Sequence, residues 1–263
     1  MPFRSDVLNA NLTKGTANSA DILQLLRYWN PAEESPAEFQ VRAVEENLLG
    51  KASRSRAEDV VKSVLSRRFF PNGQTAPADL IRKLSTAGVP RHVLDLILYY
   101  HSALAEHLLY VAAVEHVYEL RTIGHDTVPL RGLEKFIDEL SESGRIESTY
   151  TETVVKRLAQ HILTAMRDYG ILEGKAQKSI APIHIPHEVV AYLAYALKDE
   201  GHTALRIARN PDWRLLLLHE REVEDLLLDG SVLGHFTYRS AGDVKRFDWS
   251  HENLEEYVDA IAG

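Results

Sequence analysis

The 263-residue chain contains no cysteine. It can therefore form no disulfide, thiolate zinc site, iron–sulfur cluster or cysteine nucleophile. It also lacks an uninterrupted apolar run, because the most hydrophobic stretch, 93–120, carries Asp95, Glu106, Glu115 and histidines that are too costly in hydrocarbon. Residues 1–11 contain no apolar segment typical of an export signal. These absences predict a cytoplasmic protein without a membrane segment, in which 93–120 is part of a long buried helix.

Signatures of catalysis are missing as well. The pair His187-Glu188 begins like a zincin helix, but Ala191 stands where the second histidine is needed. The chain has neither a Gly-rich phosphate loop nor a Gly-x-Ser-x-Gly motif. Asp168, Glu173 and Lys175 imitate nuclease residues, yet they straddle a helix end and a turn instead of a central sheet. The sequence therefore predicts a protein that is not an enzyme, with no metal and no cofactor, and leaves a nuclease as the weakest alternative.

Helix starts and ends are legible. Capping boxes are predicted at Ser35–Glu38, Ser55–Glu58 and Thr149–Glu152, and Pro36 suits a first helical position. Glycines after apolar runs mark the ends of several helices. The expected helices are 17–29, 36–48, 55–69, 77–87, 91–121, 130–143, 150–169, 187–200, 213–229 and 251–262.

Two stretches, 171–185 and 235–249, break the helical pattern and are predicted as short hairpins. The fold class expected is mainly α: a helical protein with helix-turn-helix and winged helix-turn-helix units and one or two short β-hairpins. We expect an N-terminal domain, 1–125, with a helix-turn-helix at 36–69. A C-terminal winged-helix-like domain, 126–263, ends in a hairpin and a helix.

Acidic residues outnumber basic ones, 38 to 30, so the formal net charge is −8. Positive charge is concentrated in two windows: 51–83 holds 8 basic and 3 acidic residues, and 145–178 holds 6 basic and 4 acidic residues. The net charges of these windows are therefore +5 and +2, and each contains one predicted capped helix. Such a distribution can confine a polyanion to one groove while acidic surfaces repel it elsewhere.

The first window predicts a helix-turn-helix in which the helix from Ser55 exposes a basic face. Arg68 falls on the apolar side, which predicts that this helix frays or bends before Pro71. In such a unit the N-terminal turn enters the major groove and flanking cations neutralise phosphates. The predicted DNA-binding residues are Lys51, Ser53, Arg54, Ser55, Arg56, Lys62 and Arg67.

The second window predicts a winged helix-turn-helix made of helices 130–143 and 150–169 and the hairpin after them. Apolar and polar residues of 150–169 fall on opposite faces. A charged outer face is common in soluble proteins, so the periodicity alone leaves a purely solvated face as an alternative. The predicted DNA-binding residues are Thr151, Thr153, Lys156, Arg157, Lys175 and Lys178.

Several stretches together resemble the BrxA family of bacteriophage exclusion (BREX) phage-defence systems. They are Val44–Ser55 with Ser66-Arg67-Arg68, Thr151–Leu158, Asp168–Leu172, Asp212-Trp213 and the closing Leu254–Ile261 helix. The resemblance is diffuse and covers nearly the whole chain. It implies a helical, non-catalytic protein that binds double-stranded DNA beside a methyltransferase and other defence components. The net negative charge departs from this expectation.

The sequence thus predicts a non-enzymatic, double-stranded DNA-binding accessory protein of a BREX system. The alternative is a protein-interaction scaffold that docks other defence components through its acidic C-terminal region. The residues that motivate this alternative are Glu220, Glu222, Glu224, Asp225 and Asp229.

Overall fold

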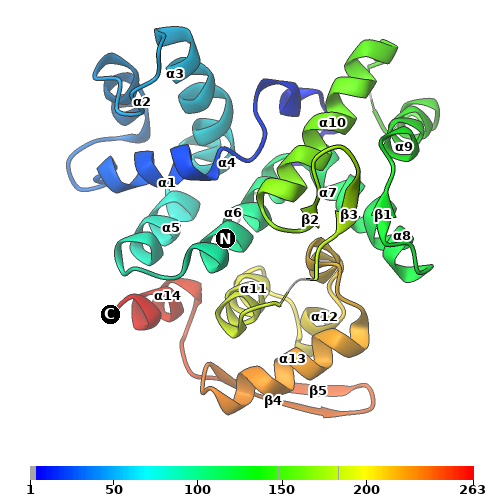
Figure 1. The fold of residues 1–263 in the computed structure, drawn as a ribbon. Coiled ribbons are helices and arrows are strands. Elements are labelled where there is room, and N and C mark those ends of the chain that lie inside the picture. Colours follow the sequence, from blue (N-terminus) through cyan, green and yellow to red (C-terminus); the bar gives the residue numbers. More distant parts are fainter. Residues whose placement is uncertain (1–3, 147, 183) are drawn as a thin grey trace.

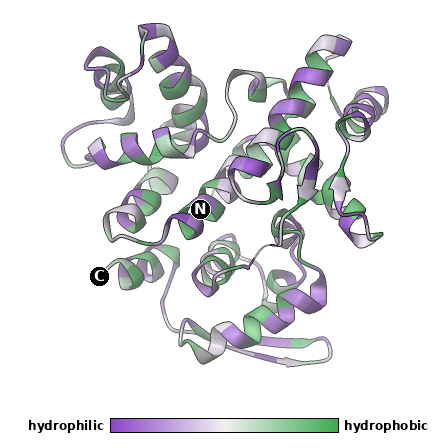
Figure 2. Cartoon of the chain, viewed as in Figure 1, coloured by the Kyte–Doolittle hydropathy of each residue, from purple (hydrophilic) through white to green (hydrophobic). Residues whose placement is uncertain are grey.

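The computed structural model describes residues 4–146, 148–182 and 184–263, and the protein is mainly helical (Figure 1). Figure 2 shows hydrophobic and hydrophilic residues alternating along the helices, as expected when each helix buries one face. The buried apolar side chains form one continuous core that extends from Leu8 to Val258. The mainly α class is confirmed. The division into domains 1–125 and 126–263 stays a prediction.

The N-terminal part is a series of short helices. They are η1 (Asn11–Lys14), α1 (Ser19–Tyr28), α2 (Pro36–Glu45), α3 (Arg54–Val60), the π-helical turn η2 (Val61–Leu65), α4 (Ser66–Phe69), η3 (Pro71–Gly73) and α5 (Ala76–Thr86). The capping box at Ser35 is confirmed, because its side chain accepts from the Glu38 amide while the Glu38 carboxylate accepts from the Ser35 amide.

The other two predicted capping boxes are wrong. Ser53 caps α3, since its extended backbone lets Oγ accept a hydrogen bond from the Arg56 amide at 3.4 Å. Glu58 therefore does not form the predicted capping box with Ser55, and its carboxylate pairs with Arg54 instead. Helix α10 (Glu152–Asp168) likewise begins two residues later than the Thr149 box requires, and its N-cap residue Thr151 makes no side-chain cap hydrogen bond.

The predicted helix 91–121 exists but is not continuous. It consists of α6 (Arg91–Ala105), α7 (His107–Val111), the π-helical turn η4 (Ala112–Val117) and α8 (Tyr118–Thr122). The break falls at Glu106, whose φ of −112° and ψ of 81° are not helical and whose buried carboxylate is engaged by arginines of α4. Of the helices in the described ranges, none combines the length and apolarity needed to cross a bilayer.

A three-stranded antiparallel sheet follows, with strands β1 (Thr127–Val128), β2 (Leu172–Glu173) and β3 (Lys178–Ile180) in the order β1-β3-β2. Helices α9 (Leu130–Glu142) and α10 lie between β1 and β2 in the chain. The predicted hairpin in 171–185 is confirmed, with Glu173 opposite Ser179. Strand β1, which pairs Thr127 with the same Ser179, was not predicted from the sequence.

The remaining chain forms a helical layer with a second hairpin. Its elements are α11 (His187–Asp199), α12 (Ala204–Ala208), η5 (Pro211–Leu216), α13 (Glu220–Val232), β4 (Phe236–Ala241), β5 (Val244–Trp249) and α14 (Leu254–Ala262). The β4–β5 hairpin confirms the prediction for 235–249.

The helix predicted for 213–229 is wrong in its first part, which is the 3₁₀ helix η5. Asn210 caps the Asp212 amide, and Leu217 ends η5 in the left-handed region at φ 57°. The cause is tertiary, because the Asp212 side chain is fully buried and accepts hydrogen bonds from Arg4, Tyr100 and Tyr110. Burial disfavours the charge of Arg4, but hydrogen bonding and attraction to Asp212 raise its pKa. This cluster fixes the N-terminal segment against η5.

Candidate nucleic-acid interface

Helix α10 buries one face and exposes a polar, basic face. The exposed residues at its start and along this face are Thr151, Glu152, Thr153, Lys156, Arg157 and Gln160, of which Glu152 is acidic. The opposite face buries Val155, Leu158 and Ile162 in the core. Within the described part of the chain, neither Lys156 nor Arg157 has a carboxylate at ion-pair distance. Their positive charges are therefore available to an external partner.

A tight turn between β2 and β3 presents a further exposed cation, Lys175. The turn needs glycine at position 174, where φ is +86° and a Cβ would lie 2.2 Å from the Gln177 carbonyl oxygen. Because β2 follows α10 after three residues and packs against it, the turn is fixed relative to the basic face.

Lys178, which was predicted to contact DNA, is buried and is not available for such a contact. Its residue is only 7% exposed, and its Nζ donates a hydrogen bond to the Lys175 carbonyl oxygen. Burial, followed by repulsion from Arg167, lowers the pKa of Lys178. The side chain thus stabilises the β2–β3 turn and does not present charge to solvent.

Most cations predicted for the first unit are compensated inside the protein. Lys51 Nζ lies 2.8 Å from Asp21 Oδ2. Arg54 and Lys62 share the Glu58 carboxylate at 3.2 Å and 3.6 Å. A hydrogen bond from Arg54 and attraction to Lys62 lower the pKa of Glu58, which keeps it ionised. These pairs are exposed enough to exchange partners, but each reduces the charge offered to a polyanion.

The charge of Arg67 is also compensated inside the protein, since its Nη2 lies 2.7 Å from Oε1 of the buried Glu106. Burial lowers the pKa of Arg67, and the attraction to Glu106 opposes this. Arg68 Nε contacts the same carboxylate at 3.2 Å, and the residue is 2% exposed. The helix does end before Pro71, as predicted: it contains the π-helical turn η2 and stops at Phe69, while this ion-pair network holds Arg68 itself in helical form.

Five predicted residues of the first unit are exposed, namely Ser53, Arg54, Ser55, Arg56 and Lys62, and of these Arg54 and Lys62 pair with Glu58. Ser53 serves as the N-cap of α3. For Arg56 no carboxylate of the described ranges lies at ion-pair distance. The first unit therefore offers one fully uncompensated cation at its helix N-terminus, where backbone amides also favour an anion.

The two basic helices lie on either side of the N-terminal segment. In Figure 1, α3 is at the upper left, α10 at the upper right, and η1, in deep blue, lies between them. Contacts of η1 with η2 and with α10 agree with this arrangement. The structure thus places α3 and α10, one from each sequence-predicted window, on either side of η1.

The catalytic alternatives gain no support from the geometry. Among the described residues, no group of three or more His, Asp or Glu side chains is placed to hold a metal ion. Asp168 pairs with Arg167 at 2.5 Å.

The acidic C-terminal region is also largely compensated. Glu220 pairs with Arg209, Glu222 pairs with Arg121, and Glu224 pairs with Lys245. Asp225 and Asp229 remain exposed on α13.

The chain matches the BrxA family over residues 8–196, well over half its length. It belongs to the BrxA family. Membership implies that the protein is a component of a BREX defence system. The BrxA family is not known for enzymatic activity. The BrxA match includes both basic helices and ends within α11, so the acidic α13 and the β4–β5 hairpin lie outside it. No curated protein matches the chain.

Two polar residues that organise this region, Glu106 and His161, were not predicted from the sequence as functional residues. His161, on α10, donates from Nδ1 to the Leu12 carbonyl oxygen at 2.7 Å. Neither residue stands in a recognisable motif, and their partners are far away in sequence. The only available signal was a carboxylate inside the apolar run 93–120, which in a stable protein requires a buried cationic partner.

Proposed function

We propose that this BrxA-family protein binds double-stranded DNA, with α10 as the principal recognition helix and α3 as a second contact. The observation that carries the proposal is the set of exposed cations Lys156, Arg157 and Lys175, on α10 and the turn after it, for which no carboxylate among the described residues lies at ion-pair distance. Cations of this kind displace condensed counterions from the phosphate backbone, which is the main source of affinity for duplex DNA.

The topology supports a winged helix-turn-helix assignment for this unit. The chain runs β1, α9, α10, β2 and β3, and β2 packs against α10, so that the β2–β3 turn is attached to this helix. In this arrangement α10 enters the major groove with its N-terminal residues toward the bases. Thr151 and Thr153 lie at that end, and Lys175 on the wing reaches a neighbouring phosphate.

The helix-turn-helix assignment for the first unit rests on α2 and α3, which pack together and are joined by residues 46–53. Arg56 and Arg54 lie in the first turn of α3. Arg54 and Lys62 share the Glu58 carboxylate, which competes with phosphate for them and lowers the net gain from this unit. Its contribution is therefore the smaller one.

The test is binding of a fluorescent duplex at low salt, followed by anisotropy. Lys156→Glu/Arg157→Glu should bind far more weakly than the wild type. A matched control is Arg239→Glu/Arg246→Glu, which reverses two exposed arginines on the remote β4–β5 hairpin. If the α10 variant binds as tightly as the control variant, the proposed site is wrong.

We propose no catalytic role. A labelled duplex incubated with the protein and Mg²⁺ or Mn²⁺ should remain intact, whereas metal-dependent cleavage would overturn this part of the proposal.

One observation favours the scaffold alternative. Leu228 is 44% exposed on α13 between the exposed Asp225 and Asp229, a surface suited to a basic partner protein. Asp225→Arg/Asp229→Arg should abolish co-purification of a defence component if this surface docks one. It should leave duplex binding intact.

A further inference from the structure

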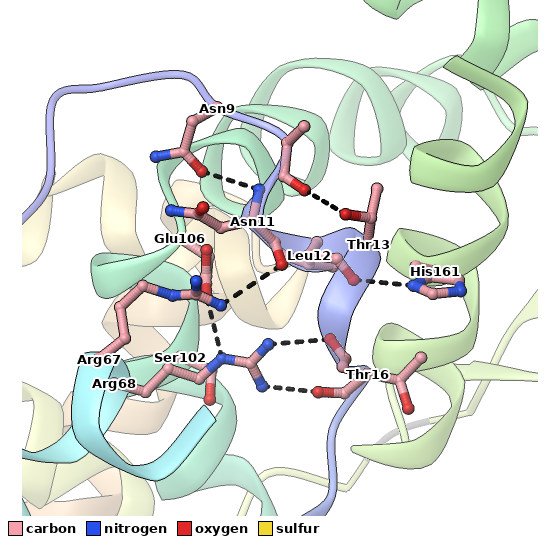
Figure 3. Close-up of polar contacts among 12 residues, drawn as sticks. Asn9, Asn11, Leu12, Thr13, Thr16, Arg67, Arg68, Ser102, Glu106 and His161 are labelled. Atoms are coloured by element: carbon pink, nitrogen blue, oxygen red, sulfur yellow. Dashed lines mark hydrogen bonds and ion pairs between the residues drawn. The ribbon is translucent and has the colours of Figure 1, made fainter. Parts of the chain in front are cut away.

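The N-terminal segment 11–16 connects α4, which continues α3 through η2, with α10 through polar contacts on both of its sides. On one side, Arg67 Nη2 donates to the Asn11 carbonyl oxygen at 3.4 Å. Arg68 donates from Nη1 to Thr16 O at 2.6 Å and from Nη2 to Gly15 O at 3.1 Å. Figure 3 shows the two arginines of α4 reaching this segment, with Glu106 beside them.

On the other side, the segment is held by α10. His161 donates to the Leu12 carbonyl oxygen at 2.7 Å, and Figure 3 shows its ring directed at that oxygen. Leu12 itself is 1% exposed, so the segment is also anchored by apolar packing. His161 lies one residue after the exposed Gln160 and four residues after Arg157, in the middle of the proposed recognition helix.

The packing leaves little room for this segment to move. A Cβ at Gly15 would lie 2.6 Å from Val64 Cγ2 of η2, so the backbone is in close contact with the helix that continues α3. The Glu106 side chain is 1% exposed and pairs with both arginines. A buried carboxylate with two guanidinium partners is costly to disrupt, because any one loss leaves an uncompensated charge.

We infer that segment 11–16 is a rigid strap, and that Arg68, Glu106 and His161 are positioning residues that fix the spacing of α3 and α10. The strap lets both helices engage one continuous duplex at the same time. This inference rests on the proposed function and deepens it, because it names a duplex spanning both units as the ligand and not two independent short sites. A fixed spacing raises the effective concentration of the second contact once the first is made.

The first experiment measures the spacing without DNA. Since the natural chain has no cysteine, spin labels can be placed at Asp59→Cys on α3 and Gln160→Cys on α10, both exposed, and their distance distribution measured by pulsed double resonance in the full chain. We expect a narrow distance distribution in this doubly labelled protein, called the parent, and a broader one when His161→Ala is added to it. His161→Asn, whose amide can donate to the same carbonyl, should restore the narrow distribution. His92→Ala, at an exposed histidine of α6, is the matched control.

A second variant, Arg68→Met, removes both carbonyl contacts and leaves Arg67 on Glu106. If it fails to fold, the partly exposed His161 still decides the question. An unchanged distance distribution in His161→Ala overturns the inference, as does a broad distribution in the parent.

The second experiment compares a duplex of about 10 base pairs, one helical turn, with one of about 30 base pairs. The parent should prefer the longer duplex, and His161→Ala should lose about 3- to 10-fold of that preference, as expected for one hydrogen bond. The short-duplex affinity should not change. If the parent binds neither duplex, the proposed function fails while the spacing result still stands. If it binds both with equal affinity, the strap inference fails alone.

Discussion

The two basic units differ in how much of their charge reaches the surface. The first unit, α2 to α4, directs Lys51, Arg54 and Lys62 to neighbouring carboxylates and buries Arg67 and Arg68 against Glu106. The second unit, α9 to β3, leaves Lys156, Arg157 and Lys175 exposed. The window with the larger net charge in sequence, 51–83, is thus the one with less uncompensated charge in the fold. A segment's net charge does not measure the positive potential that a ligand meets.

The difference has a structural origin. The α4 arginines are used to neutralise a carboxylate at the break between α6 and α7 and to hold the N-terminal segment. By contrast, α10 has its buried face built from Val, Leu, Ile and Met side chains, so its cations are not needed inside. Helix α4 thus uses its charges inside the protein, whereas Lys156 and Arg157 of α10 stay exposed to solvent.

The largest effect should come from breaking the buried network of the first unit. Glu106→Gln leaves two guanidinium groups without their carboxylate, and we expect it to lower the free energy of unfolding by about 3–5 kcal/mol. Urea denaturation measures this, with Glu119→Gln, an exposed carboxylate on α8, as the control. A loss below about 1 kcal/mol would mean that the network is not structural.

Next in size is the removal of charge from the second unit. Lys156→Glu/Arg157→Glu/Lys175→Glu should reduce the slope of log affinity against log salt by about three units, since each contact displaces about one counterion. A salt titration of duplex binding checks this. An unchanged slope would show that these side chains do not meet phosphates.

A smaller effect is expected from the first unit. Arg54→Glu/Arg56→Glu should reduce the salt slope by about one unit, because Arg54 already shares Glu58 and only Arg56 is uncompensated. The same titration measures it. A reduction as large as two units would show that DNA displaces Glu58 completely.

The smallest effect should increase affinity. Glu58→Gln releases Arg54 and Lys62 from their shared carboxylate, so duplex affinity should rise roughly two- to fivefold at low salt. Asp59→Asn, an exposed neighbour, controls for the general loss of negative charge. An equal gain in both variants would mean that Glu58 does not restrain the cations specifically.

The sequence predicted features that depend on local patterns. The Ser35 capping box, the two faces of α10 and both hairpins follow from side-chain periodicity and turn residues within a few positions. It could not predict contacts between distant segments. The pairing of Arg67 with Glu106, of Lys51 with Asp21 and the strand β1 depend on residues that only the tertiary fold brings together.

For the candidate site, the sequence indicated two basic windows but could not predict how much of their charge stays unpaired in the fold. Lys178 is an example. From the sequence it was predicted as another cation of the wing, whereas in the fold its Nζ donates a hydrogen bond to the Lys175 carbonyl oxygen. Burial and pairing decide which charges a ligand can reach, and neither is visible in composition.

The most direct test of the central claim is one salt titration series of duplex binding by three proteins: the wild type, Lys156→Glu/Arg157→Glu and Arg54→Glu/Arg56→Glu. We predict that the α10 variant loses about two units of salt slope and the α3 variant about one. An equal loss in both variants, or a larger loss in the α3 variant, would contradict the account that α10 provides the principal DNA-binding surface.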